Sequence, residues 1–268
     1  MSDEPELVTE RRGNVLLVRI NRPEQRNAMN GAVMAGIGRA MLSADADPEI
    51  RAVVLTGTGD KAFCAGMDLK AFASGGLGSG ADDEEAMAAF GLFTGGAATG
   101  GDSACSKPVI AAAQATAVAG GLELVLACDL AVVAENAKLG LPEVKRGLFA
   151  AGGGMYLARR IPLAKALELT MTGDPITPAQ ALSLGLINAV APAEEVVEVA
   201  IALANRIAEN GPLGVQASKK LVRAAAFEPL ADVRQAHGEA VGKVFNSQDA
   251  KEGATAFAER RAPKWTGQ

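Results

Sequence analysis

Short apolar runs alternate with longer amphipathic segments over the first two-thirds of the chain. Five of these runs have the length of strands and end at turn-forming or charged residues: 14–20, 52–56, 109–113, 130–134 and 186–190. Most are apolar at nearly every position, whereas a strand with one solvated face alternates between apolar and polar residues. The pattern therefore predicts an α/β fold in which helices cover both faces of a sheet.

Apolar residues recur at helical spacing between and after these runs. One apolar face predicts a helix over residues 29–43, and a shorter helix is expected over 82–93, between two glycine-rich segments. From residue 192 onward the whole pattern is helical, with helices expected over residues 196–207, 213–225 and 230–245. We therefore divide the chain into an α/β core, residues 1–191, and a helical C-terminal region, residues 192–268.

Composition and charge narrow the class of protein. The chain has 268 residues, of which 49% are apolar and 21% charged, so general disorder is excluded. A net charge of −5 argues against nucleic acid as the main partner, which would require a basic face. The uncharged apolar run at residues 108–122 is too short to span a bilayer, and the acidic N-terminus lacks the apolar core of a signal peptide. We expect a cytoplasmic protein that binds neither nucleic acid nor membrane.

Few residues are available for metal or cofactor chemistry. Cys64, Cys105 and Cys128 lack the spacing of a metal site and are interpreted as reduced thiols. His237, the single histidine, cannot form a two-histidine zinc site. Residues 57–62 fit the pattern G-x-G-x-x-A after a strand, but the residues that follow open a helix poorly. We interpret that segment as a tight turn rather than a dinucleotide site.

Two turns built from small residues each lead into a helix. Residues 63–67 precede a short helix for which Asp68 is a plausible N-cap, and residues 119–121 open an apolar helix that runs to Cys128. The first N–H groups of a helix have no helical partner, and two such groups that converge form an oxyanion hole. From spacing alone, close helix packing is the alternative explanation of these glycines.

Two glutamates lie in apolar segments. Glu123 is inside the nearly uncharged helix, and Glu143 follows Leu-Gly-Leu-Pro at residues 139–142. Burial raises the pKa of a carboxyl group towards neutrality, which suits general acid–base catalysis. The residues alone leave a structural role equally open, in which Glu143 caps the next helix or pairs with Lys145 or Arg146.

Four sequence blocks occur in a fixed order, within a match that covers nearly the whole chain. They are residues 21–29 (NRPEQRNAM), 62–69 (AFCAGMDL), 107–129, which include Gly120-Gly121-Leu122-Glu123-Leu124, and 140–154, which include Gly140-Leu141-Pro142-Glu143. Together they resemble the enoyl-CoA hydratase (crotonase) superfamily. The resemblance implies a spiral of stacked ββα units with a helical C-terminal trimerisation region, and a homotrimer or a hexamer made of two trimers.

The resemblance also implies roles for individual residues. The N–H groups of Met67 and Gly120 would hold the thioester oxygen of an acyl-CoA, while Glu123 and Glu143 bind the water that adds to a 2-enoyl-CoA. Glu143 would exchange the proton at C2 and Glu123 would help to deprotonate the water that attacks C3. Coenzyme A belongs to the substrate, and no metal or other cofactor is implied. The residues expected to contact the substrate or its CoA are Arg26, Ala28, Ala65, Asp68, Lys70, Gly121, Phe257 and Arg260.

Within this set, Phe257 and Arg260 are expected to contact CoA bound to a neighbouring subunit.

The sequence departs from the family pattern at two places. Ala119 replaces the first of three glycines, and Gln114-Ala115 replaces Asn-Gly. Both departures leave the carboxylates in place and affect the expected shape of the acyl pocket.

Two other functions compete with hydration. An isomerase of the same superfamily would shift a double bond with Glu143 alone, and the presence of Glu123 favours hydration over this reaction. A non-catalytic, acyl-CoA-binding or RNA-associated relative is the second alternative. The acidic balance argues against RNA, and the intact pair of glutamates argues against an inactive site.

Overall fold

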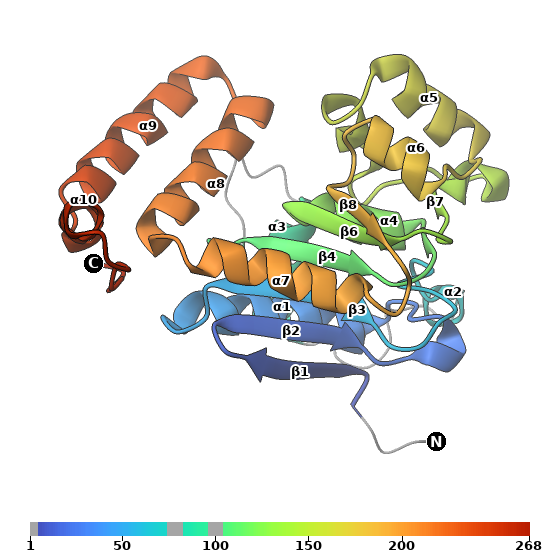
Figure 1. Cartoon of the computed structure of the whole chain (residues 1–268). Helices are drawn as coiled ribbons and strands as arrows, with labels where there is room; N and C mark the ends of the chain where they lie inside the picture. The colour runs from blue at the N-terminus through green and yellow to red at the C-terminus, as the bar shows by residue number, and fades with distance from the viewer. Residues whose placement is uncertain (1–4, 74–82, 96–103) are drawn as a thin grey trace.

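A six-stranded sheet forms the centre of the computed structural model, which describes residues 5–73, 83–95 and 104–268 (Figure 1). The strand order is β1-β2-β3-β4-β6-β8, and only β1 is antiparallel to its neighbour. The strands are β1 (Leu7–Arg12), β2 (Val15–Ile20), β3 (Ala52–Gly57), β4 (Val109–Ala113), β6 (Leu130–Ala134) and β8 (Ala189–Ala191). Every residue of β3 and β4 is buried, as their continuous apolar runs predict.

Helices cover both faces of this sheet, which confirms the predicted α/β class. In Figure 1, α7 (Val196–Ala208) crosses the front of the sheet, and α1 (Gly31–Ala46) lies behind it. The side chain of Asn30 caps α1 by accepting a hydrogen bond from the N–H of Val33 at 3.0 Å. The helix therefore begins two residues later than its apolar pattern predicts, and Met29 is left in an extended segment.

A second ladder runs beside the main sheet. Strand β5 (Ala117–Val118) pairs with β7 (Leu139–Gly140) in parallel. Isolated bridges extend this ladder, joining Met29 with Met67, Cys64 with Ala117, and Leu139 with Ile176. Successive segments of the chain thus supply a strand to the main sheet, a short piece to the second ladder and a helix, which is the expected stack of ββα units.

The remaining helices of the core are short. They are α2 (Leu69–Ala73), α3 (Glu84–Thr94), α4 (Gly120–Ala127), α5 (Leu163–Thr172) and α6 (Pro178–Ser183), with 3-10 turns η1 (Pro23–Gln25), η2 (Pro142–Arg146) and η3 (Gly154–Arg159). The glycine-rich segments singled out in the sequence, 74–80 and 95–101, lie outside the described residues except for Gly95.

Three C-terminal helices stand away from the sheet (Figure 1): α8 (Pro212–Phe227), α9 (Leu230–Phe245) and α10 (Gln248–Glu259). The buried carboxylate of Asp249 accepts hydrogen bonds from the N–H groups of Thr266 at 2.7 Å and Gly267 at 2.9 Å, which fastens the chain end to α10. The boundary expected at residue 191 marks the change from strands to helices. Because α7 contributes Val196 and Ala200 to the core, the protruding helices begin with α8.

The cysteines are part of the packed interior. Cys64, Cys105 and Cys128 are all buried thiols. Burial raises the pKa of Cys64 to about 12 and that of Cys105 to about 11, so both thiols stay protonated at neutral pH. Among the helices of the described segments, none has the length and apolar character needed to cross a membrane.

Candidate active site

A buried asparagine fixes the loop that precedes α1. Arg26 and Asn27 both have positive φ values, 53° and 55°, which turn the chain sharply. The Asn27 side chain accepts a hydrogen bond from the N–H of Arg22 at 3.0 Å and donates to the carbonyls of Thr58 at 2.9 Å and Ala62 at 2.7 Å. This loop is thereby tied to the segment after β3, and Met29 is brought beside residues 66–68.

The bridge between Met29 and Met67 orients a backbone N–H group. Met29 donates its N–H to the carbonyl of Gly66 at 2.8 Å, and Asp68 donates to the carbonyl of Met29 at 2.8 Å. In a parallel bridge of this kind the central residue, here Met67, directs its own N–H to the opposite side. A Cβ atom on Gly66, whose φ is +98°, would lie 3.1 Å from the backbone nitrogen of Gly120. The turn at residues 66–67 therefore lies directly against the start of α4.

The first N–H group of α4 faces this turn. Gly120 is the first residue of the helix, so its N–H lacks a helical acceptor. Over the described segments, neither Gly120 nor Met67 donates its N–H to a protein atom. Two unsatisfied donors on adjacent turns suit a carbonyl oxygen that gains negative charge during a reaction.

The two glycines at the start of α4 have different surroundings. A Cβ atom on Gly120 would meet the terminal methyl of Met29 at 2.8 Å and the Cα of Gly66 at 3.3 Å, so the main obstacle is a flexible side chain. A Cβ atom on Gly121 would overlap the backbone carbonyl of Cys64. Gly121 is therefore required for packing, whereas Gly120 lies at the candidate oxyanion hole. The contact between Gly121 and CoA stays a prediction.

Ala119 adopts a backbone conformation that disfavours side chains. It has φ 52° and ψ −132°, and its N–H donates to the carbonyl of Gly140 at 2.9 Å. In the family pattern that the sequence resembles, a glycine stands at this position. The position lies next to the donor at Gly120, so strain is stored beside the candidate site.

We expect Ala119→Gly to raise the free energy of unfolding by about 1 kcal/mol. The backbone strain at Ala119 is about 1–3 kcal/mol, and glycine removes it. This gain is larger than the conformational entropy that glycine loses on folding, which costs about 0.5–1 kcal/mol. Chemical denaturation beside the wild type measures the difference. Ala115→Gly is the matched control, because Ala115 is also buried but has a negative φ, and it should lose stability. A less stable Ala119→Gly variant would contradict the prediction.

Glu123 projects from the first turn of α4 into a nearly closed environment. Its side chain is 9% exposed, and Oε1 accepts a hydrogen bond from the N–H of Gly154 at 3.0 Å. Burial raises the pKa of Glu123, the charge of Glu143 raises it further, and the N–H groups of Gly154 and Gly152 act in the opposite direction. The structure therefore brings the two predicted glutamates within electrostatic range of one another.

Glu143 occupies the first turn of η2 without a counter-ion. Its Oε2 atom is buried and has no hydrogen-bond partner among the residues that the structure describes. Burial raises its pKa, and the positive charge of Arg146 offsets only part of the shift. Lys145 pairs instead with Asp174 at 2.5 Å. Of the structural alternatives, pairing of Glu143 with Lys145 is therefore wrong. Arg146 lies close enough to affect the pKa of Glu143, but no ion pair joins these two residues in the described segments.

Two glycines that support the site were not among the predicted site residues. Gly154 donates to Glu123, and a Cβ atom on Gly152 would lie 2.7 Å from Oε2 of Glu123. The run Gly152-Gly153-Gly154 was the available signal, because consecutive glycines leave room for a side chain to approach the backbone.

The residues expected to contact CoA fall into two groups. Arg26, Ala28, Ala65, Asp68 and Lys70 lie on the two adjoining loops at residues 22–30 and 64–70, where the N–H of Ala65 donates to the carbonyl of Arg26 at 3.1 Å. Phe257 and Arg260 lie at the end of α10, on the opposite side of the molecule from α2 (Figure 1). Within one chain the second group is far from the first. Contact with CoA on a neighbouring subunit stays a prediction.

The carboxylate of Asp68 has internal partners. Oδ1 accepts hydrogen bonds from the N–H groups of Lys70 at 3.0 Å and Ala71 at 3.3 Å, so Asp68 caps α2 as expected. Oδ2 pairs with the guanidinium of Arg22 at 3.0 Å. The Asp68 side chain therefore holds the loop in place. The contact between Asp68 and CoA stays a prediction.

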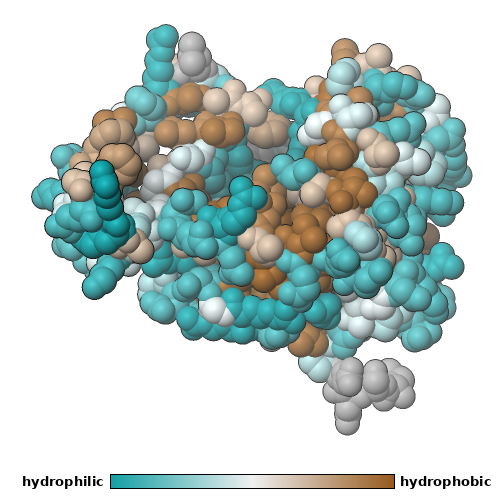
Figure 2. Space-filling model, in the orientation of Figure 1, coloured by the Kyte–Doolittle hydropathy of each residue, from teal (hydrophilic) through white to brown (hydrophobic). Residues whose placement is uncertain are grey.

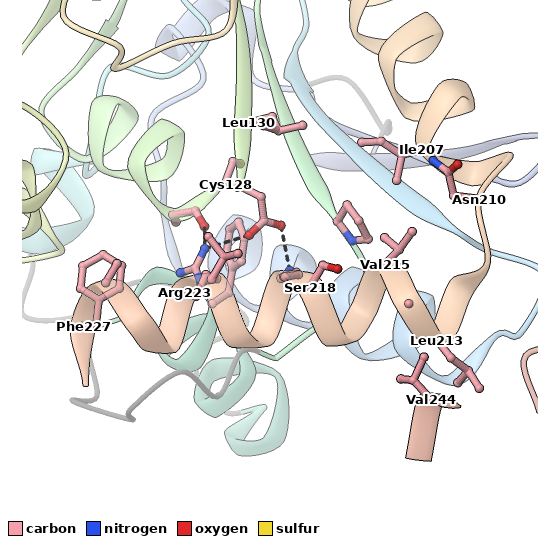
Figure 3. Close-up of a pocket in the computed structure, with 18 of the residues that line it drawn as sticks. Cys128, Leu130, Ile207, Asn210, Leu213, Val215, Ser218, Arg223, Phe227 and Val244 are labelled. Atoms are coloured by element: carbon pink, nitrogen blue, oxygen red, sulfur yellow. Dashed lines mark hydrogen bonds and ion pairs between the residues drawn. The ribbon is translucent and has the colours of Figure 1, made fainter. Parts of the chain in front are cut away.

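A cavity of about 1220 Å³ opens beside Glu123. It extends between α4 and the C-terminal helices, and Figure 3 shows Val215, Ser218 and Arg223 of α8 projecting towards Cys128 and Leu130. Within the described ranges, no cluster of three or more histidine, cysteine, aspartate or glutamate side chains could hold a metal ion.

A family model and similar proteins of known name all point to one family. A family model described as enoyl-CoA hydratase/isomerase matches residues 10–268. Enoyl-CoA hydratase EchA19 of Mycobacterium tuberculosis is 40% identical over 271 aligned residues, which cover 97% of this chain and 96% of that protein. A carnitinyl-CoA dehydratase of Salmonella typhi is 38% identical over 268 residues, covering 96% of this chain and 97% of its own.

A solved structure shares the whole fold. The crystal structure of enoyl-CoA hydratase EchA1 from Mycobacterium marinum matches with a TM-score of 0.86 and 42% sequence identity. The match covers 99% of this chain and 100% of that one. It confirms the predicted crotonase fold.

Proposed function

This chain belongs to the enoyl-CoA hydratase/isomerase family, and we propose that it is an enoyl-CoA hydratase, a hydro-lyase that adds water to 2-enoyl-CoA thioesters. One observation carries the proposal: two carboxylates of raised pKa, Glu123 and Glu143, accompany the two unsatisfied N–H groups of Met67 and Gly120. Relatives named as a hydratase and a dehydratase are consistent with it, since dehydration is the same reaction in reverse.

The proposed mechanism uses the donors to stabilise an enolate. Addition of water at C3 moves electron density onto the thioester oxygen, where the N–H groups of Met67 and Gly120 donate to the developing charge. Glu123 accepts a proton from the attacking water, so a C–O bond forms at C3. Glu143 delivers a proton to C2, and the carbonyl is restored. The product is a 3-hydroxyacyl-CoA, with one water gained.

No metal or further cofactor takes part in the proposed reaction. The loops at residues 22–30 and 64–70, which carry Arg26, Ala28, Ala65 and Lys70, would bind the CoA part of the substrate. We propose a cytoplasmic location. The acyl part would enter the cavity beside Glu123.

A panel of 2-enoyl-CoA thioesters tests the proposal. Hydration removes the conjugated chromophore, and mass spectrometry of the product should show the mass of one added water. A product of unchanged mass with a shifted double bond would support the isomerase instead. Tight binding of every thioester with no product of either kind would indicate a non-catalytic acyl-CoA-binding protein.

We expect the protein to assemble as a trimer or as a hexamer of two trimers. Large apolar side chains are exposed on the C-terminal helices and on α5, including Val222, Phe245, Phe257, Leu163 and Met171. Figure 2 shows apolar residues gathered in both of these regions of the visible face. Exposed apolar surface of this kind is typical of an interaction site.

Light scattering or sedimentation measures the assembly directly. The mass in solution should be three or six times 27.3 kDa. Phe245→Asp, which places a charge on a side chain that is 74% exposed, should lower the mass without unfolding the subunit. A wild-type protein that remains a monomer at micromolar concentration would contradict the expectation.

A further inference from the structure

The cavity beside Glu123 continues past the end of α4. Its wall includes Glu123, Leu126 and Ala127 of α4 together with Leu213, Val215 and Trp265 of the C-terminal region. At 1.5 Å per residue, the end of α4 lies about 6 Å from Glu123 along the helix axis. An acyl chain that has its double bond at Glu123 would therefore pass the C-terminal end of α4.

Three basic side chains meet at this point. Asp129 accepts ion pairs from Lys219 at 2.8 Å and from Arg223 at 2.9 Å. Lys219 also donates to the carbonyls of Cys105 at 3.0 Å and Lys107 at 2.8 Å, so its charge is fully engaged. Figure 3 shows Arg223 reaching from α8 into these contacts.

Arg160 is the third of these basic groups, and it lacks a carboxylate of its own. Its guanidinium donates to the carbonyl of Leu126 at 2.9 Å, and in the described part of the chain no acidic group forms an ion pair with it. Burial lowers the pKa of Arg160, the neighbouring charge of Arg223 lowers it further, and the negative charge of Asp129 offsets part of the shift. An arginine nevertheless remains charged in a protein.

The local charge does not balance. At the end of α4, Arg160, Lys219 and Arg223 carry three positive charges, and Asp129 is the carboxylate that pairs with two of them. Of the other charged residues that line the cavity besides Glu123, Asp249 binds the chain end and Arg159 donates to the carbonyl of Ala226. The carbonyl end of a helix contributes about half of a negative charge, which offsets only part of the difference. The cavity wall is thus apolar over most of its length and positive at the end of α4.

We propose that Arg160 selects acyl groups that end in a carboxylate, so the preferred substrates are CoA thioesters of unsaturated dicarboxylic acids. The inference rests on the proposed hydratase function and specifies the acyl group that the same site takes. A guanidinium binds a carboxylate through paired hydrogen bonds, and a cavity that excludes water strengthens the pair. Acyl groups with a cationic end meet a charge of the same sign and are disfavoured.

Three matched substrates test the selection. They are 2-enoyl-CoA thioesters of equal chain length that end in a methyl group, a carboxylate or a trimethylammonium group, compared at several lengths. The carboxylate should have a kcat/KM about 10- to 100-fold above that of the methyl group, as expected for a hydrogen bond between charged groups. The trimethylammonium substrate should be the poorest. Equal kcat/KM values for the three at every length would overturn the proposal.

Variants assign the selection to Arg160. In Arg160→Met the ratio of kcat/KM between the carboxylate and methyl substrates should fall at least tenfold, and Arg160→Lys should retain part of it. Arg206→Met is the matched control, because Arg206 is exposed on α7 and is not part of the cavity wall. A preference that survives in Arg160→Met would remove Arg160 from this role. Where that variant does not fold, the wild-type ranking and Arg160→Lys decide.

A binding measurement separates this inference from the proposed reaction. Saturated acyl-CoA thioesters with the same three ends are titrated calorimetrically, so no turnover is needed. Absence of hydration together with tighter binding of the carboxylate would reject the hydratase proposal and leave the selection by Arg160 standing. Hydration of all three substrates with equal affinities would reject the selection alone.

Discussion

Glu123→Gln and Glu143→Gln are each expected to lower kcat about 10²- to 10⁴-fold, with little change in KM. Glutamine keeps the size of the side chain and removes the group that exchanges a proton. Because both carboxylates act on one water, the double variant should lose less activity than the product of the two single losses. Steady-state turnover of a 2-enoyl-CoA, followed by its absorbance, measures each value.

Glu135→Gln is the matched control, because Glu135 is exposed and lies outside the site. It should keep wild-type turnover. Wild-type-like activity in Glu123→Gln together with an inactive Glu143→Gln would instead support the isomerase, which needs only the second carboxylate.

The pH dependence provides a second readout of the same pair. Burial raises the pKa of both carboxyl groups, so Glu123 has to lose a proton at a higher pH than an exposed glutamate before it can accept one from water. Turnover should therefore fall as the pH is lowered through this raised value. The free energy of unfolding has the opposite trend. Both carboxyl groups bind a proton more tightly in the folded state than in the unfolded chain, so the folded state loses stability as the pH rises through the same interval.

Gly120→Val is expected to lower kcat/KM about 10²- to 10³-fold, the usual effect of losing one oxyanion donor. The added side chain crowds the thioester oxygen and rotates the N–H group away from it. The melting temperature should fall only modestly, because the nearest obstacle to a Cβ atom is the flexible end of Met29. Turnover and thermal melting are measured on the same sample.

The neighbouring glycine supplies the contrast. Gly121→Ala adds fewer atoms, yet its Cβ atom overlaps the backbone carbonyl of Cys64, which cannot move without shifting the second ladder. We expect Gly121→Ala to lower the free energy of unfolding by about 1–3 kcal/mol or more, as is typical of overpacking, or to prevent folding.

For the first of these two variants, a folded Gly120→Val enzyme with wild-type kcat would remove Gly120 from the site.

Most of the sheet follows from the apolar runs, and its exceptions have physical causes. β1 was not predicted because LVTERR contains mostly polar residues, which an edge strand can expose. In the run at 186–190, Leu186 and Ile187 are buried and fill the core from the turn before the strand, whereas only the last two residues of the run belong to β8. Burial could be inferred from hydropathy there, whereas pairing could not.

The sequence likewise predicts one part of the candidate site and not another. Glu123 could be suspected from sequence because a carboxylate inside an apolar helix is costly unless it has a partner or a function. Its partner, the N–H of Gly154, is a backbone group 31 residues away and leaves no trace in side-chain chemistry. The different roles of Gly120 and Gly121 likewise depend on which atom faces each Cα, and only the tertiary contacts decide that.

The second ladder also determines when the site comes into existence. Its parts come from successive segments of the chain: Met67 lies beside Met29, α4 begins after β5, and β7 pairs with β5 before Glu143 is reached. Contacts between distant segments form slowly, because a loop must close before the pairing stabilises it. A nascent chain that ends at residue 122 contains both N–H donors and neither carboxylate. If the proposed mechanism holds, synthesis must therefore pass Glu143 before the set of reactive groups is complete, and pass Gly154 before Glu123 has its hydrogen-bond partner.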